Sequence, residues 1–231
     1  GFMTVAQVQL IAKQTMSYME NQIKVGMRLR DIRDIAEDRM LSLGATSFWY
    51  WDIGAFIFSG RDTRRSVSGK RYRTKDKRVE CDDIITIDLS PQSGDSWGDY
   101  ARTFVIEGGE VVRDIDAIKN AEWRDGIAMT AKLHELLSDF VSPRTTFEAL
   151  YNYINRFLKV NGYINCDFLG NLGHSIATDK GDRIYIENGN TAELPAVEYF
   201  TFEPHISIKR GKYGFKREDI YYFQDNQLVK L

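Results

Sequence analysis

The feature that most constrains the fold is an order of elements that occurs twice: two amphipathic segments followed by strand-like runs. Apolar residues recur at helical spacing in 5–23, 29–43, 116–141 and 145–160. Strand-like runs follow each pair, at 47–59, 84–89 and 100–106, and then at 184–187, 199–202, 205–209 and 220–223. No linker rich in Pro, Gly or Ser separates the halves. We therefore expect a single α+β domain, residues 1–231, with two similar halves around one mainly antiparallel sheet.

One strand carries a carboxylate in its interior. Residues 87–104 read IDLSPQSGDSWGDYARTF, with Asp88 inside an apolar run and Asp99 eleven positions later. The runs 84–89 and 100–106 are joined by a loop of Ser, Pro and Gly, which predicts an antiparallel pair. Aspartate is depleted in strands and costly to bury without compensation, so both carboxylates are candidates for a functional site.

Further acidic and imidazole side chains lie among apolar or glycine-rich neighbours. His174 is in LGNLGHSI, Glu203 in YFTFEPH and Glu218 in GFKREDIYYF. Four carboxylates that face one interior would repel one another unless cations neutralise them, and a pair of divalent ions about 3.5–4 Å apart can do so. Oxygen donors with one nitrogen and no thiolate suit Mn²⁺, Co²⁺, Fe²⁺ or Zn²⁺.

These segments resemble metallopeptidase family M24, which includes methionine aminopeptidase, aminopeptidase P and prolidase. The segments IDLS, DYARTF, GHSIA, FTFEP and KREDI follow the order of the family's IDxG, DxTRT-like, GHxIG, FTxEP and RxED motifs. The resemblance implies the pita-bread (creatinase/aminopeptidase) fold, with helices outside a curved sheet. It also implies two metal ions that activate a water to attack an amide bond, with Glu203 moving the proton. The implied metal ligands are Asp88, Asp99, His174, Glu203 and Glu218.

The chain departs from the family pattern at two histidines. The segments where the family carries them, 59–68 and 178–183, contain none here. His205, just after Glu203-Pro204, is therefore a second catalytic candidate, and His134 in the middle of a helix is expected to be structural or on the surface. Residues 60–80 are rich in Arg and Lys, which predicts a long exposed loop or hairpin. Its arginines could alternatively overhang the site and bind an anionic group. The residues expected to bind substrate are Arg64, Arg65, Arg71 and Trp51.

The composition argues against nucleic acid and membranes as partners of the chain. The net charge of −2 gives no overall attraction to nucleic acid or an anionic membrane, and no apolar run approaches the ~20 residues of a membrane span. Two cysteines without CxxC spacing suggest reduced thiols in the cytoplasm. We expect an aminopeptidase or Xaa-Pro peptidase-like hydrolase that acts on a small peptide or amide-bearing substrate. The sequence is compatible with a homodimer. The missing histidines leave two alternatives: a non-peptidase enzyme of this type acting on a small metabolite, and a non-catalytic binding module.

Overall fold

The computed structural model describes residues 2–231, and four α-helices lie within that range. They are α1 (Val5–Gln22), α2 (Leu29–Ser42), α3 (Ala121–Phe140) and α4 (Phe147–Val160). Each was expected from apolar periodicity, and three begin and end close to the expected residues. The third begins later than expected, because Asn120 accepts a hydrogen bond from the backbone N–H of Trp123 (3.1 Å) and caps α3 there. A short 3₁₀ turn, Ile115–Ala117, precedes it.

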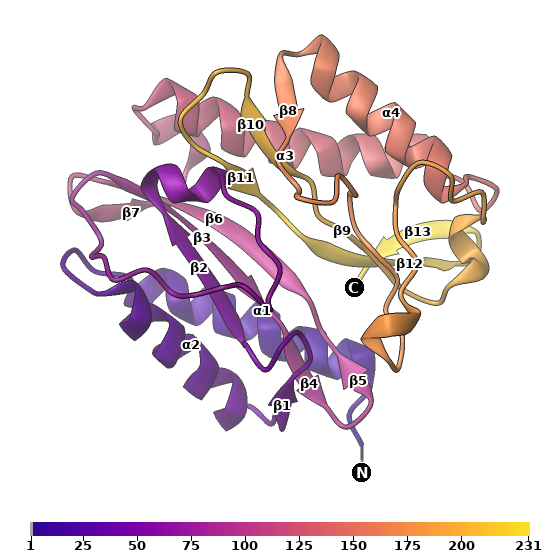
Figure 1. Ribbon diagram of the computed structural model, residues 1–231, viewed down its shortest axis with the longest axis horizontal. Coiled ribbons are helices and arrows are strands. Elements are labelled where there is room, and N and C mark those ends of the chain that lie inside the picture. Colours follow the sequence, from indigo (N-terminus) through magenta and orange to yellow (C-terminus); the bar gives the residue numbers. More distant parts are fainter. Residues whose placement is uncertain (1) are drawn as a thin grey trace.

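The N-terminal half is an antiparallel sheet covered by α1 and α2 (Figure 1). Its strands, in spatial order, are β2 (Ala55–Ser59), β3 (Asp83–Leu89), β6 (Tyr100–Glu107) and β7 (Glu110–Val112). The predicted pairing of the second and third of these is confirmed, with Asp88 opposite Ala101. A small sheet at its end contains β1 (Ser47–Phe48), β4 (Pro91–Ser93) and β5 (Ser96–Trp97).

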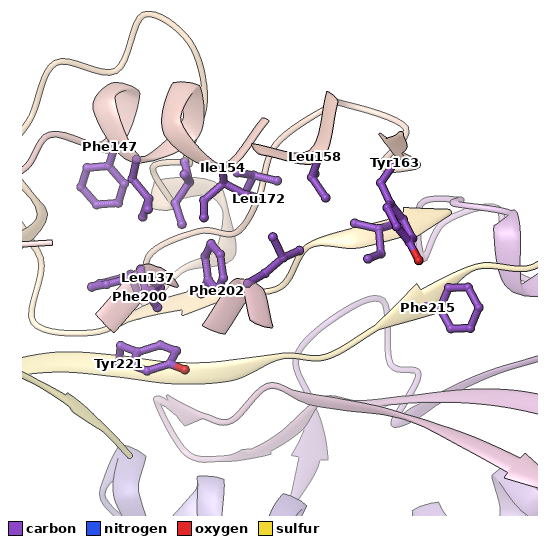
Figure 2. Packing of buried hydrophobic residues seen from close by; sticks show 14 of the residues in the cluster. Leu137, Phe147, Ile154, Leu158, Tyr163, Leu172, Phe200, Phe202, Phe215 and Tyr221 are labelled. Carbon is purple, nitrogen blue, oxygen red and sulfur yellow. The ribbon is translucent and has the colours of Figure 1, made fainter. Parts of the chain in front are cut away.

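The C-terminal half contains two further antiparallel sheets, covered by α3 and α4. One contains β11 (Phe215–Lys216), β10 (His205–Ile208) and β8 (Tyr163–Asn165), in that spatial order. The other contains β13 (Gln227–Lys230), β12 (Asp219–Gln224) and β9 (Phe200–Phe202). Figure 2 shows the core between these strands and helices, where Phe147, Ile154 and Leu158 of α4 face Phe200 and Phe202. The burial of these large apolar side chains holds the helices on the strands.

The two halves meet where β6 runs beside β11 and β12 (Figure 1). The backbone N–H of Glu218 donates to the carbonyl of Ala101 (3.0 Å). Two positions away, the Thr103 hydroxyl accepts from the N–H of Lys216 and donates to its carbonyl, each at 2.9 Å. This registration brings residues about 115 positions apart in the sequence to the same place between the halves, and it positions the last predicted metal ligand.

Several local expectations need correction. The run 47–59 is not one strand, because Trp51 and Asp52 adopt positive φ and turn the chain between β1 and β2. Residues 60–80 begin with a 3₁₀ turn, Gly60–Arg64, and are not fully exposed: Tyr72 is buried, and the backbone N–H of Ile57 donates to its hydroxyl (2.9 Å). The run 184–187 forms only an isolated bridge, between Tyr185 and His174.

Some short strands were not expected, including β8 and β13, because runs of three or four residues carry little periodicity. Across residues 2–231, no helix is long and apolar enough to cross a membrane.

Candidate metal centre

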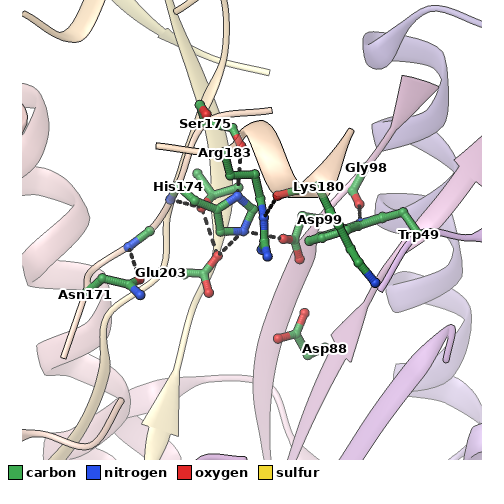
Figure 3. Close-up of polar contacts among 12 residues, drawn as sticks. Trp49, Asp88, Gly98, Asp99, Asn171, His174, Ser175, Lys180, Arg183 and Glu203 are labelled. Carbon is green, nitrogen blue, oxygen red and sulfur yellow. Dashed lines mark hydrogen bonds and ion pairs between the residues drawn. The ribbon is translucent and has the colours of Figure 1, made fainter. Parts of the chain in front are cut away.

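Four of the five predicted metal ligands converge between the two halves. Each offers one donor atom, and these atoms all lie within 4.8 Å of one another: Asp99, His174, Glu203 and Glu218. Asp99 immediately precedes β6, Glu203 immediately follows β9, and Glu218 lies between β11 and β12. Figure 3 shows three of these side chains pointing toward one another from different segments of the chain. The convergence depends on both halves, because Asp99 comes from the N-terminal half and the other three residues come from the C-terminal half.

Asp99 is held in place by the first helix. Its backbone N–H donates to the Gln9 side chain (2.8 Å), and the Gln9 amide nitrogen donates back to its carbonyl (2.9 Å). The indole N–H of Trp49 donates to the neighbouring carbonyl of Gly98 (2.8 Å). These bonds satisfy the backbone at the strand entry, so the buried carboxylate is aimed at the centre rather than at its own backbone.

The tautomer of His174 follows from its hydrogen bonds. Nδ1 lies 2.9 Å from the carbonyl oxygen of Ser175, which can only accept, so Nδ1 carries a hydrogen. Nε2 therefore faces Asp99 Oδ2 at 3.1 Å and Glu203 Oε2 at 3.5 Å. Burial alone would lower the pKa of His174, but the hydrogen bond to Asp99 and the charge of Glu203 raise its pKa above the ordinary value. The carboxylates thus require positive charge at Nε2, from a proton or from a metal ion.

A close backbone approach positions the imidazole. Gly173 has φ +147°, and a Cβ there would overlap the carbonyl of Thr201. The Thr201 hydroxyl accepts from the backbone N–H of His174 (3.0 Å) and donates to Glu203 Oε2 (2.8 Å). Thr201 is fully buried and therefore links two of the candidate ligands directly.

Glu218 is the clearest sign that the centre needs a cation. Its side chain is fully buried, and neither carboxylate oxygen has a hydrogen-bond partner within residues 2–231. Burial raises the pKa of Glu218 well above its ordinary value, and the charges of Asp99 and Glu203 add to this. An orphaned buried carboxylate beside two others and an imidazole is the donor chemistry of a first-row divalent metal site, so the residues present fit such an ion.

Asp88, the fifth predicted ligand, has a different partner. Its Oδ2 accepts from Lys216 Nζ at 2.7 Å, and the same ammonium lies 3.5 Å from Glu203 Oε1. Burial raises the pKa of Asp88 to about 7, against the opposing effect of the Lys216 charge. Burial also opposes ionisation of Glu203, but the charges of Lys216 and His174 and the hydrogen bond from Thr201 lower the pKa of Glu203 to about 2.

A cavity of about 140 Å³ opens onto the centre. Its wall combines aromatic side chains with two guanidinium groups, from Arg65 and Arg183. The Arg183 guanidinium lies over the rings of Trp49 (5.1 Å) and Tyr185 (5.4 Å), and Figure 3 shows it beside His174. Arg65 lies in 59–68 and Arg183 in 178–183, the two segments in which the family carries its additional histidines.

The other residues proposed for catalysis and substrate binding lie as follows. His205 lines the cavity, and its Nε2 donates to the carbonyl of Thr63 (2.6 Å). Burial lowers the pKa of His205 to about 4, so it is neutral near pH 7. Arg64 is half-buried and Arg71 is exposed, and both lie outside the cavity wall. Trp51 is 44% exposed and carries Lys180 over its ring at 4.0 Å, also outside that wall.

Sequence reasoning missed Lys216, Thr201 and Arg183. Lys216 could have been found, because residues two apart in an extended segment share a face and Lys216 precedes Glu218 by two. The same spacing relates Thr201 to Glu203. Arg183 offers no such signal, since its place beside Trp49 depends on a loop packed across the two halves.

Comparison with known proteins identifies the family to which this architecture belongs. The sequence profile of metallopeptidase family M24 matches residues 4–225. The chain belongs to metallopeptidase family M24. No curated protein is significantly similar to it in sequence. The M24 assignment agrees with the five motif segments and with the clustered carboxylates and imidazole.

Solved structures confirm the pita-bread fold. An X-Pro aminopeptidase from Thermotoga maritima superposes with a TM-score of 0.80 at 21% identity, covering 98% of this M24 chain and 59% of that one. The prolidase from Pyrococcus furiosus superposes with a TM-score of 0.79 at 21% identity, covering 98% of this chain and 61% of the prolidase. A dipeptidase from Mycobacterium ulcerans superposes with a TM-score of 0.77 at 17% identity, covering 98% of this chain and 56% of the dipeptidase. The chain thus spans about three fifths of the length of these structures, and at such identities the likeness concerns the fold.

Proposed function

We propose that this M24 protein is a metal-dependent hydrolase that cleaves an amide bond in a small peptide-like substrate. The observation that carries the proposal is the buried Glu218 carboxylate, which lies unpaired among Asp99, Glu203 and His174 at the end of a cavity. Such a cluster is unfavourable as a purely structural feature, because burial of unpaired carboxylates destabilises the fold. A bound divalent cation would compensate the buried charge.

Four residues would hold the ion: Asp99, His174, Glu203 and Glu218. A divalent ion bound there would supply Lewis acidity, which polarises an amide carbonyl and makes a water more acidic. Glu203 lines the cavity, so its carboxylate is placed to accept a proton from a water bound there. Thr201 holds its Oε2, which orients the carboxylate for that transfer.

The identity and number of the ions belong to this proposal. Three carboxylates and one imidazole are suited to Mn²⁺, Co²⁺, Fe²⁺ or Zn²⁺. The pair of ions expected from the family resemblance would also require Asp88, whose carboxylate is engaged by Lys216.

The wall of the cavity supports a small substrate with an anionic group. Tyr50, Phe56 and Phe58 supply apolar surface, while Arg65 and Arg183 supply guanidinium groups that suit a carboxylate. Neither Arg64, Arg71 nor Trp51 lines this wall, so their part in substrate binding stays a prediction. Dipeptides with a free carboxyl end, Xaa-Pro among them, are the first substrates to examine.

The second candidate is a non-peptidase hydrolase of a small carboxylate-bearing metabolite. It is favoured by arginine side chains next to the positions where the family's peptidases carry histidines. A non-catalytic binding module is less consistent with the retention of four clustered donors. A cytoplasmic location stays part of the proposal, supported by the free thiols of Cys81 and Cys166.

The test is hydrolysis by the metal-loaded protein of a panel of dipeptides and of small N-acyl carboxylates. Glu203→Gln should abolish turnover of whichever class is cleaved, whereas the exposed Glu198→Gln should leave it unchanged. Preferential cleavage of the N-acyl carboxylates would support the second candidate. If neither class is cleaved, or if Glu203→Gln retains full activity, the hydrolase proposal is wrong.

A further inference from the structure

We propose that His205 selects the substrate by accepting a hydrogen bond, through its Nδ1 nitrogen, from the N–H of the amide that is cleaved. The preferred substrates are then secondary amides. Tertiary amides such as Xaa-Pro dipeptides, whose scissile nitrogen carries no hydrogen, are poor ones. The inference rests on the proposed function, because it names the class of amide that the same cavity accepts.

The first argument is the tautomer of the imidazole. His205 Nε2 lies 2.6 Å from the carbonyl oxygen of Thr63, which can only accept, so Nε2 carries a hydrogen. Nδ1 has no hydrogen-bond partner within residues 2–231. A second hydrogen on Nδ1 would add an unpaired positive charge to a cavity wall that already holds the Lys216 ammonium. Nδ1 therefore presents a lone pair to whatever enters the cavity.

The second argument is that the ring is fixed in place. His205 begins β10, and its carbonyl accepts from the backbone N–H of Cys166 (2.7 Å). The turn that carries Thr63 is bound to the same half, because the backbone N–H of Gly214 donates to the Thr63 hydroxyl (2.8 Å). A Cβ at Gly214 would overlap the Thr63 carbonyl and lie 2.8 Å from His205 Nε2, so glycine lets the turn and the ring meet. Nδ1 is thus held at one position in the cavity wall.

The third argument is the burial of this free acceptor. His205 is 7% exposed, yet it lines the cavity. A nearly buried acceptor without a partner is unfavourable, and a donor on a bound ligand removes that cost. The carboxylates of the same wall, from Asp88, Asp167 and Glu203, attract a substrate ammonium more strongly than a neutral imidazole does. The imidazole is therefore suited to an uncharged N–H.

The fourth argument is the position of His205 relative to the residue that accepts the proton. Glu203 and His205 are separated by one proline, and both line the cavity. Because the residue before a proline is extended, the Cα atoms of positions 203 and 205 are about 7 Å apart. An amide whose carbonyl carbon is attacked beside Glu203 carries its N–H on the adjacent atom. This N–H is the substrate donor within reach of Nδ1.

The experiment uses pairs of substrates that differ only at the scissile nitrogen. Ala-Gly is compared with Ala-sarcosine, and N-acetylglycine with N-acetylsarcosine, where a methyl group replaces the hydrogen. For Mn²⁺-loaded protein we expect kcat/KM to favour the glycine member of any cleaved pair by about tenfold or more. Equal values, or faster cleavage of the sarcosine member, would overturn the inference.

Matched variants separate the hydrogen bond from a clash with the added methyl group. His205→Phe keeps a ring of similar size and removes the acceptor, so the preference for the glycine member should fall to about threefold or less. Lys209→Met, an exposed change just after β10, should keep the wild-type preference. A full preference in His205→Phe would show that the methyl group, not His205, decides. If His205→Phe does not fold, the wild-type ratio and the tautomer measured by NMR decide.

Two readouts do not depend on turnover. Nitrogen-15 NMR of histidine-labelled, metal-free protein should show His205 with a hydrogen on Nε2 and none on Nδ1; a protonated Nδ1 would overturn the inference even if the protein is a hydrolase. If neither pair is cleaved, the dissociation constants of the same intact compounds decide. Tighter binding of the glycine members, by about tenfold, would support the role of His205 while the hydrolase proposal is refuted. Equal binding, or none, would overturn both.

Discussion

Replacement of Thr201 by valine gives the sharpest test of how the centre is held together. The hydroxyl of this fully buried residue accepts from the backbone N–H of His174 (3.0 Å) and donates to Glu203 Oε2 (2.8 Å). Valine has nearly the same shape, so the change leaves no large cavity. It leaves a buried N–H without a partner and removes a hydrogen bond to an ionised carboxylate.

The magnitude follows from these two losses. An unsatisfied buried donor costs about 1–3 kcal/mol, and a hydrogen bond to a charged group contributes about 1.5–3 kcal/mol. Burial of the added methyl group returns about 1 kcal/mol. We therefore expect Thr201→Val to lower the free energy of unfolding by about 1.5–5 kcal/mol. We also expect metal affinity to fall about 10–100-fold, since both affected residues are candidate ligands.

Urea denaturation of the metal-free protein and calorimetric titration with Mn²⁺ measure the two effects. Thr201→Ser is the control, because it keeps the hydroxyl and loses only a buried methyl group, at a cost of about 1 kcal/mol. The reasoning is refuted if valine is no more destabilising than serine, or if the valine variant binds Mn²⁺ as tightly as the wild type.

Three further predictions concern the protonation of His134, the backbone at Gly173 and the binding of Mn²⁺. Burial lowers the pKa of His134 to about 3, whereas it is near 6.5 in an unfolded chain, so unfolding takes up a proton below pH 6.5. Wild type should therefore lose about 2 kcal/mol more stability than His134→Gln between pH 7 and pH 5 in urea denaturation, and equal slopes would contradict this. Gly173→Ala should destabilise by more than about 3 kcal/mol because its Cβ meets the Thr201 carbonyl, while Gly170→Ala, with open space around it, should cost only about 1–2 kcal/mol in the same assay. Mn²⁺ at 100 times its Kd should stabilise the wild type by about 2.7 kcal/mol in a thermal shift measurement, and Glu218→Gln should largely abolish the shift; a shift of equal size in the variant would show that Glu218 is not a ligand.

The elements that the sequence predicts well are those with a strong local pattern. Each of the four helices repeats apolar residues over about four turns or more, and the pair formed by β3 and β6 is joined by a loop of turn-forming residues. Some short strands, β8 and β13 among them, were missed because runs of three or four residues carry little periodicity, and their pairing is decided by distant partners. Trp51 and Asp52, in positive φ, divide a run that reads as one aromatic strand.

The candidate ligands could be named from the sequence because five segments resemble the M24 motifs, and because a carboxylate among apolar neighbours is costly to bury. The structure brings three of these carboxylates, Asp99, Glu203 and Glu218, together with His174. The same reasoning also selected Asp88, but the partner of a buried charge is a matter of three dimensions. Lys216 lies 128 positions from Asp88 along the chain, and no local pattern connects them.

The sequence by itself determined the class of fold, because periodicity is a local property, and its motif segments named the candidate donor residues. Tertiary structure alone decided which cation meets which carboxylate and which arginines enter the cavity. The contact between Lys216 and Asp88 depends on the register of β6 against β11, which is set by packing across both halves.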